Sequence, residues 1–442
     1  MPSEEDVQPG DGGPSRPRKL AMWMKVCLVV FVCCAVLFGV ILRGQAKIAV
    51  VFKGIEEKGG GFDSQSFGKG LLQSLGISTK HGFTRVLIGA FVPKPTADEL
   101  EGLRGAPFLS SLYLMEGDVD ESLSKLLGDL RLLKSLHLID YGLTDQDLRR
   151  VMESLRSPSQ LGGLELRNTS LTDEGLATIG GKAPLHALMI DGSKIKGGGL
   201  LHVNLSELRI LHLKRSNISD TGLAEIGRQN CSLLCGLRLD NNPVTDTGLN
   251  SLQGLTSLYE LGVGGTEVTP GGLAELLKKL PITILGLNDL SWTMEDLQRL
   301  SLDTTTLKGL ELAGWNIGDT DLKSLPNMPN LTSLDLSRTR VTDEGLKELV
   351  RFPKLNSIQL DGTQITIQGL KSLQKSFTLW RISISKTGLT CEDLMELPTS
   401  PILQVFTLDG MNLSMDQLRK LGRQHPNAIF RSDNRIVFPQ NY

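Results

Sequence analysis

Apolar residues recur along this chain in a short pattern, L-x-x-L-x-L, that returns about every 24 residues. Within each occurrence apolar and polar positions alternate, which predicts a short β-strand with one buried face. A weaker copy of the pattern stands before the first unit, at residues 86–91, and a half unit follows the last one, at residues 428–434. Thirteen units at this period predict a solenoid of stacked coils. The second apolar residue of each unit, used below as its marker, falls at positions 112, 136, 164, 188, 211, 237, 261, 285, 310, 334, 358, 382 and 406.

Between successive strands the pattern predicts a helix that begins at a corner written T-D-x-G-L. In one such corner Thr172 offers an N-cap oxygen, and Asp173 places a negative charge in the first helical turn. Leu176 and Ile179 then share one helix face and point toward the strands. Gly175 costs about 1 kcal/mol inside a helix relative to alanine, so we interpret it as allowing close approach between stacked helices. Three units depart from this corner, and we expect weaker capping there; they read IKGGGL, WTMEDL and LTCEDL.

The N-terminal region differs sharply from the repeats. Residues 26–42 are 17 uncharged, almost wholly apolar residues, and with residues 20–24 they are long enough to cross a bilayer as a helix. We expect a single membrane anchor with the repeats on the non-cytoplasmic side. The alternative is a signal peptide cleaved near Ala46, which would give a secreted protein. The predicted organisation is a disordered tail at 1–19, a transmembrane anchor at 20–42, an N-terminal cap segment at 43–82, a repeat domain at 83–425 and a C-terminal cap at 426–442.

Composition and motif searches exclude several functions. The 442 residues carry a formal net charge of -2, so the chain lacks the basic excess that attracts nucleic acid. The six histidines show no metal-ligand spacing. The glycine-rich run at 59–72 has Asp63 and Gly70 where a phosphate loop needs glycine and Ser or Thr. We therefore expect no enzymatic activity, no metal, no small-molecule cofactor and no nucleic-acid partner.

The repeated unit resembles the leucine-rich repeat family whose units read L-x-x-L-x-L-x-x-T-x-[LIV]-[TS]-D-x-G-L, a type common in bacterial proteins and in ubiquitin-ligase adaptors. The resemblance covers about residues 83–425. It implies an α/β solenoid, or horseshoe, with a parallel sheet on the concave side and α-helices on the convex side, used mainly to bind other proteins. Nothing between 43 and 82 resembles an F-box, so an adaptor role is a weak alternative.

The function we expect is protein recognition by the concave face of a membrane-anchored repeat domain. The alternatives are a structural or adhesive spacer of the cell envelope and an enzyme of unknown kind. Units seven to nine carry glycine at several concave positions and offer little side chain to a ligand, so we expect binding on units one to six. The candidate residues there are Tyr113, His137, Glu165, Arg167, Met189, Asp191, His212, Lys214, Arg238 and Asp240.

The same alternation predicts which side chains are buried farther along the chain. Leu334 and Ile358 are markers, so we expect both in the core. Asp335 and Gln359 follow them on the opposite face, and we expect both to be exposed. Replacing either polar residue should then cost little stability.

Overall fold

A computed structural model describes the repeat region almost completely. The described residues are 61–66, 85–106, 108–229, 231–300, 302–373, 378–398, 404–432 and 435–437. The predicted tail and membrane anchor, residues 1–19 and 20–42, lie outside this range. Among the described residues no helix is both long and apolar enough to cross a bilayer.

Seventeen strands of the described chain pair in sequence order into one curved sheet. Strands β2 to β16 run parallel, whereas β1 and β17 pair antiparallel at the two ends. The strands are β1 Gly61–Ser66, β2 Arg85–Pro93, β3 Ser111–Met115, β4 Ser135–Ile139, β5 Gly163–Arg167, β6 Ala187–Asp191, β7 Ile210–Lys214, β8 Gly236–Arg238, β9 Glu260–Gly262, β10 Ile284–Gly286, β11 Gly309–Glu311, β12 Ser333–Asp335, β13 Ser357–Gln359, β14 Arg381–Ser383, β15 Val405–Thr407, β16 Ile429–Ser432 and β17 Arg435–Val437.

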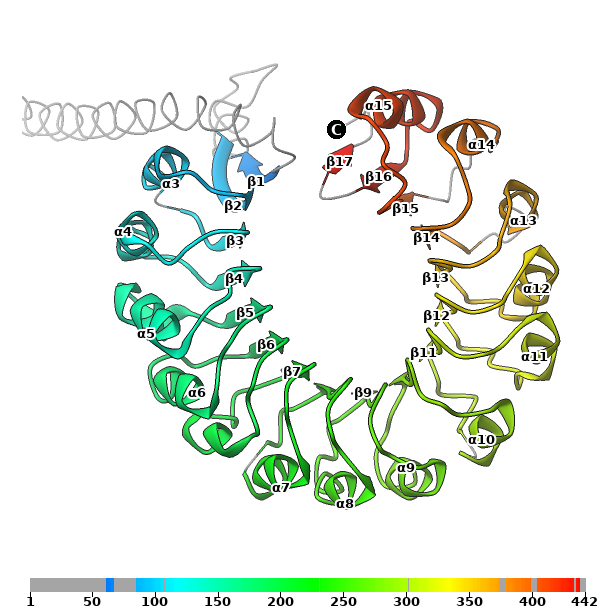
Figure 1. Cartoon of the computed structure of the whole chain (residues 1–442), viewed down its shortest axis with the longest axis horizontal. Helices are drawn as coiled ribbons and strands as arrows, with labels where there is room; N and C mark the ends of the chain where they lie inside the picture. Colours follow the sequence, from blue (N-terminus) through cyan, green and yellow to red (C-terminus); the bar gives the residue numbers. More distant parts are fainter. Residues whose placement is uncertain are drawn as a thin grey trace, which may run out of the picture.

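Each coil returns to the next strand through a helical segment on the outside of the curve. Figure 1 shows an open ring with the strands lining its inside and the helices forming its rim. The predicted horseshoe is confirmed. The helices are α3 Ala97–Leu103, α4 Glu121–Asp129, α5 Asp145–Ser154, α6 Asp173–Ile179, α7 Asp220–Arg228, α8 Asp246–Asn250, α9 Pro270–Leu277, α10 Met294–Arg299, α11 Asp319–Ser324, α12 Asp343–Leu346, α13 Ile367–Leu373, α14 Cys391–Met395 and α15 Met415–Gln424, with 3-10 segments η1 Pro158–Gln160, η2 Gly198–His202 and η3 Lys347–Arg351.

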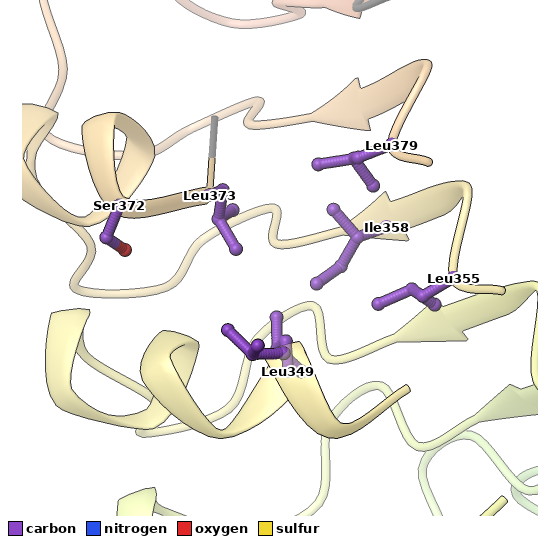
Figure 2. Close-up of a pocket in the computed structure, with 7 residues that line it drawn as sticks. Leu349, Leu355, Ile358, Ser372, Leu373 and Leu379 are labelled. Carbon is purple, nitrogen blue, oxygen red and sulfur yellow. The ribbon is translucent and has the colours of Figure 1, made fainter. Parts of the chain in front are cut away.

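The core lies between the sheet and the helices, where the repeat pattern predicts it. All thirteen marker residues are at most 3% exposed. The parallel register places each marker opposite the next, as in the run Leu310, Leu334 and Ile358. The core is closely packed at β12 and β13. Around Ile358 only a cavity of about 10 Å³ remains, bordered by aliphatic side chains such as Leu349 and Leu373 (Figure 2), which is room for about one water molecule.

The aspartate of the T-D-x-G-L corner binds the next coil. Asp319 accepts hydrogen bonds from the backbone N–H of Thr342 (2.8 Å) and from its Oγ1 (2.7 Å), 23 residues later in the chain. The Thr342 hydroxyl in turn caps its own helix by accepting from the Glu344 N–H. The same arrangement joins four other pairs of coils, through Asp145 and Thr172, Asp220 and Thr245, Asp246 and Thr269, and Asp343 and Thr366.

The glycine of the corner makes room for this carboxylate. A Cβ on Gly345 would lie 2.4 Å from Asp319 Oδ1, and one on Gly369 would lie 2.2 Å from Asp343 Oδ1. The sequence interpretation was therefore incomplete: the glycine admits the aspartate of the preceding coil. One coil supplies the aspartate and the next supplies the threonine and the glycine, so a coil that takes part on both sides carries all three residues, as Thr342, Asp343 and Gly345 show.

Two coils without this inter-coil carboxylate cap the start of the helix with residues of their own coil. Thr293 with Asp296, and Thr390 with Asp393, each form a complete capping box. The expectation of weak capping at WTMEDL and LTCEDL was therefore wrong. In both coils the aspartate at the third helical position accepts a hydrogen bond from the N-cap backbone N–H. At IKGGGL the N-cap residue Gly197 has no side chain, but Asp173 of the preceding coil accepts hydrogen bonds from the Gly197 and Gly199 N–H groups, both at 3.0 Å, so the start of the 3-10 segment η2 is capped by the neighbouring coil.

Replacing Asp319 with alanine should lower the free energy of unfolding by about 1–2 kcal/mol, because two charge-assisted hydrogen bonds to Thr342 are lost. Urea denaturation followed by circular dichroism measures the loss. Asp416→Ala is the matched control: Asp416 also lies in a first helical turn, but its side chain is 94% exposed. Equal losses in both variants would mean that these aspartates act only through the helix dipole.

Candidate functional site

Nine of the ten candidate residues lie on β3 to β8, strands that line the inner side of the ring (Figure 1), and Asp240 lies just beyond β8. The structure divides most of them between two groups. Tyr113, His137, Glu165 and Arg167 lie together at β3–β5. Asp191, Lys214, Arg238 and Asp240 lie farther along, at β6–β8 and the edge beyond it. Between the groups Met189 is half-buried, and His212 is held neutral because burial lowers its pKa to about 4.

The first group, which we call the aromatic cluster, is a continuous chain of contacts between Tyr113, His137, Glu165 and Arg167. The ring of Tyr113 stacks on that of His137 at 3.5 Å with an 8° tilt. His137 Nδ1 lies 2.6 Å from Glu165 Oε2, and Arg167 Nε donates to Glu165 Oε1 at 2.6 Å. The outer members stay accessible, because Tyr113 is 36% exposed and the Arg167 side chain 49% exposed.

The carboxylate at the centre of the aromatic cluster is ionised. Burial alone would raise the pKa of Glu165, but the hydrogen bond from His137 and the charge of Arg167 outweigh burial and hold that pKa below its usual value. The anionic Glu165 thereby fixes the orientation of both neighbouring side chains. A partner would meet a preorganised surface and would lose less side-chain entropy on binding.

Next to the aromatic cluster, a serine stands in an arrangement used for acyl transfer. Ser135 Oγ lies 2.6 Å from His137 Nε2, so serine, histidine and glutamate stand in the order of a catalytic triad. Acyl transfer also needs N–H donors for an oxyanion. The backbone N–H groups of Ser135, Gly162 and Gly163 all donate to backbone carbonyls of the preceding coil, at Ser110 or Lys134. We therefore assign the Ser135 contact to the ordering of His137.

The second group contains a buried ion pair that spans four coils, from β8 to β11. Arg238 Nη1 and Nη2 donate to the two carboxylate oxygens of Glu311 at 2.7 and 2.5 Å, and Arg238 Nε donates to Glu260 at 2.6 Å. Asn288 adds a fourth hydrogen bond to Glu311 at 2.8 Å. The Arg238 side chain is only 12% exposed. The charge of Arg238 is therefore neutralised by Glu260 and Glu311 inside the protein.

The glycines of units seven and eight provide the space in which this pair lies. A Cβ on Gly262 would approach Arg238 Cγ to 3.2 Å, and one on Gly286 would approach Glu311 Oε2 to 3.2 Å. The sequence analysis predicted only that these glycines offer little side chain to a ligand. The structure shows that they allow Arg238 of β8 to reach Glu311 of β11. Glu311, the one charged residue directly after a marker in units seven to nine, was the signal for this pair.

Beyond the ion pair, the edge of the sheet carries a polar hollow of about 480 Å³. Three candidate residues, Asp191, Lys214 and Asp240, line it. Asp191 accepts a 2.7 Å hydrogen bond from Arg215. Asp240 is only 5% exposed, and Lys214 Nζ stands 3.5 Å from its Oδ2. Sequence reasoning did not find that residues as distant as Ser337 and Asp409 line the same hollow.

Comparison with known proteins agrees with the repeat geometry. Residues 327–350 match the family described as "Leucine Rich repeat". This stretch is one 24-residue unit containing β12 and α12, and neighbouring coils pair with it in the same register. The chain is a leucine-rich repeat protein. No curated protein sequence matches it.

Among solved structures, this leucine-rich repeat protein is similar to an internalin (InlF) from Listeria monocytogenes. The two share 18% sequence identity with a TM-score of 0.35, and the alignment covers 74% of this chain and 91% of the internalin. The leucine-rich repeat fold is consistent with protein–protein interaction.

Proposed function

We propose that this leucine-rich repeat protein binds another protein on its concave face between β3 and β8, and that residues 20–42 anchor it in a membrane. The observation that supports binding is the aromatic cluster. Tyrosine and arginine are the residue types that concentrate binding energy at interfaces, and here Tyr113 and Arg167 are accessible while Glu165 holds their surroundings in place. A protein that acts only as a structural spacer would need no such arrangement of side chains.

The size of the concave face suits a protein ligand. Six strands at about 4.8 Å spacing span roughly 25–30 Å, which is the dimension of a standard interface of about 800 Å² per partner. The sheet is a rigid scaffold, because the markers beneath it are fully packed. A partner would therefore bind without large rearrangement of this chain.

Replacing Tyr113 and Arg167 together with alanine should reduce capture of the partner by about ten-fold or more. The full chain serves as bait for extracts of its source, and the captured proteins are identified and quantified. Melting temperature should change little, since both side chains lie at the surface. The matched control is Tyr259→Ala with Arg149→Ala, which removes an exposed tyrosine and an exposed arginine from outside the aromatic cluster. Equal loss of capture in both double variants would contradict binding at this cluster.

The membrane proposal has a separate test. If residues 20–42 form an anchor with the repeats on the non-cytoplasmic side, protease added to intact cells should digest the repeat domain. The anchor should be retained in the mature chain. A mature protein that begins at Lys47 would instead show that the N-terminal segment is a cleaved signal peptide.

A further inference from the structure

The segments that lead into the strands lie together at one edge of the ring, which we call the amino edge. Strands β2 to β16 run parallel, so these segments share one side of the sheet, opposite the corners where the helices begin. Backbone hydrogen bonds align them from coil to coil: the Arg209 N–H donates to the carbonyl of His186, and the Tyr259 N–H donates to that of Cys235. Equivalent residues of neighbouring coils therefore form rows with a spacing of about 4.8 Å.

From β4 to β9 the amino edge is basic. It carries five lysines and arginines and only one acidic residue, Glu207. All five cations are exposed, and none of them is ion-paired within the described part of the chain. They are Arg131, Lys134, Arg156, Lys182 and Arg209. The segments that make up this part of the edge are 130–134, 155–162, 180–186, 203–209, 229–235 and 251–259.

The opposite edge of the same coils is acidic. Helix-start aspartates such as Asp145, Asp173 and Asp220 lie there. The formal net charge of -2 therefore hides two edges of opposite charge. An anionic surface would attract one edge and repel the other, which selects the orientation in which the ring approaches that surface.

Large apolar side chains are exposed among the basic residues. Leu132, Leu233 and Tyr259 belong to the amino edge, and Phe108 stands one coil earlier; each is 37–44% exposed. Basic and apolar side chains on one face are typical of proteins that rest on a bilayer, because headgroup phosphates attract the cations and the acyl boundary takes up the apolar groups. Nucleic acid would satisfy the cations alone and would leave the leucines in water.

We propose that the amino edge between β3 and β9 rests on an anionic lipid surface, with its five unpaired cations at the headgroup phosphates. This inference rests on the proposed membrane anchor at residues 20–42 and adds which side of the ring meets the bilayer and which lipid charge the contact requires. Six steps between strands give a contact roughly 30 Å long. The concave face would then stand upright on the membrane and stay open to a protein partner.

Acetylation of lysines in the full chain tests this contact, because a lysine at a bilayer surface reacts slowly with a water-soluble N-hydroxysuccinimide ester. The chain is inserted into nanodiscs of phosphatidylcholine, alone or mixed in equal parts with phosphatidylglycerol, and mass spectrometry measures the rate at each lysine. We expect Lys134 and Lys182 to react about five-fold more slowly in the anionic discs, and high salt should remove the difference. Lys194 and Lys196, which are exposed at the opposite edge, should react at the same rate in both discs.

Arg156→Gln with Arg209→Gln removes two of the five cations and leaves both reporter lysines in place. Each cation near an anionic surface contributes about five-fold to binding, so the slowing at Lys134 and Lys182 should fall to less than about two-fold. The matched control is Arg149→Gln with Arg340→Gln, which neutralises two exposed arginines away from the amino edge and should keep the full slowing. The melting temperature should be the same in all three proteins, because the four replaced side chains are exposed.

Equal rates in the two kinds of disc, equal slowing at all four lysines, or the same loss of slowing in both double variants would overturn the inference. Slowing by polyglutamate but not by anionic lipid would also overturn it, since the edge would then fit an acidic protein. The anchor is judged separately, by whether the chain stays with the discs. Retention by both discs without slower acetylation supports the anchor and overturns the inference. Retention by the anionic discs alone, with slower acetylation, overturns the anchor and supports the inference, and retention by neither overturns both.

Discussion

Replacing Leu334 with aspartate is expected to lower the free energy of unfolding by about 3–5 kcal/mol, enough to unfold part of the solenoid. Leu334 is fully buried in β12, between Leu310 and Ile358 of the adjacent strands. An ionised carboxylate there would lose its hydration and find only aliphatic neighbours. Urea denaturation monitored by circular dichroism measures the effect, and Ile358→Asp should behave in the same way.

Val350→Asp is the matched control for this substitution. Val350 belongs to η3 of the same coil but is 71% exposed, so the same change of side chain should cost at most about 0.5 kcal/mol. A similar loss in Val350→Asp would show that the marker positions do not define the core.

The sequence predicts the markers well because their burial follows from alternation, which is local. Alternation does not predict how open the inner face is. Asp335 was expected to be exposed and the structure shows this to be wrong, since it is only 8% exposed. Its Oδ1 accepts a 2.9 Å hydrogen bond from the Ser337 N–H, and burial raises its pKa. On the inside of a curved sheet, side chains from adjacent strands crowd together, and this depends on curvature that a single repeat does not reveal.

The helix corners show a similar limit. Capping rules treat each helix separately, so they predict the N-cap threonine but place the aspartate in its own helix. The structure adds the bond from Asp319 to Thr342 one coil later. Stacking at a period of about 24 residues brings the two together, and the missing Cβ of Gly345 allows the approach.

The two groups of candidate residues differed in how far they could be predicted. The aromatic cluster joins residues at equivalent positions of adjacent strands, so the repeat alone brings Tyr113, His137 and Glu165 side by side. The pair of Arg238 and Glu311 spans 73 residues. Its formation depends on an extended arginine passing over two glycine-bearing strands, and side-chain reach of this kind is not visible in the repeat pattern.

Arg238 therefore has a structural role, and replacing it with methionine should destabilise the protein by about 3–5 kcal/mol. Methionine keeps much of the side-chain volume but leaves Glu260 and Glu311 without their shared cation. The buried Glu311 carboxylate would retain only Asn288 among its present hydrogen-bond donors. Adding Glu311→Gln to Arg238→Met should recover part of the loss, because the unpaired charge is removed. Denaturation of the two variants and wild type measures this recovery.

The pH dependence of the same variant separates loss of charge pairing from loss of packing. In the wild type, burial would raise the pKa of Glu311, but Arg238 holds it below its ordinary value of 4.5. Glu311 then stabilises the fold above pH 4.5, and this contribution is lost as the pH falls through its folded pKa. Without Arg238, burial dominates and the folded pKa lies above 4.5, so protonation between pH 7 and 4.5 favours the folded state. The stability gap between wild type and Arg238→Met should therefore narrow as the pH is lowered over this range. A gap that stays constant would show that the loss comes from packing.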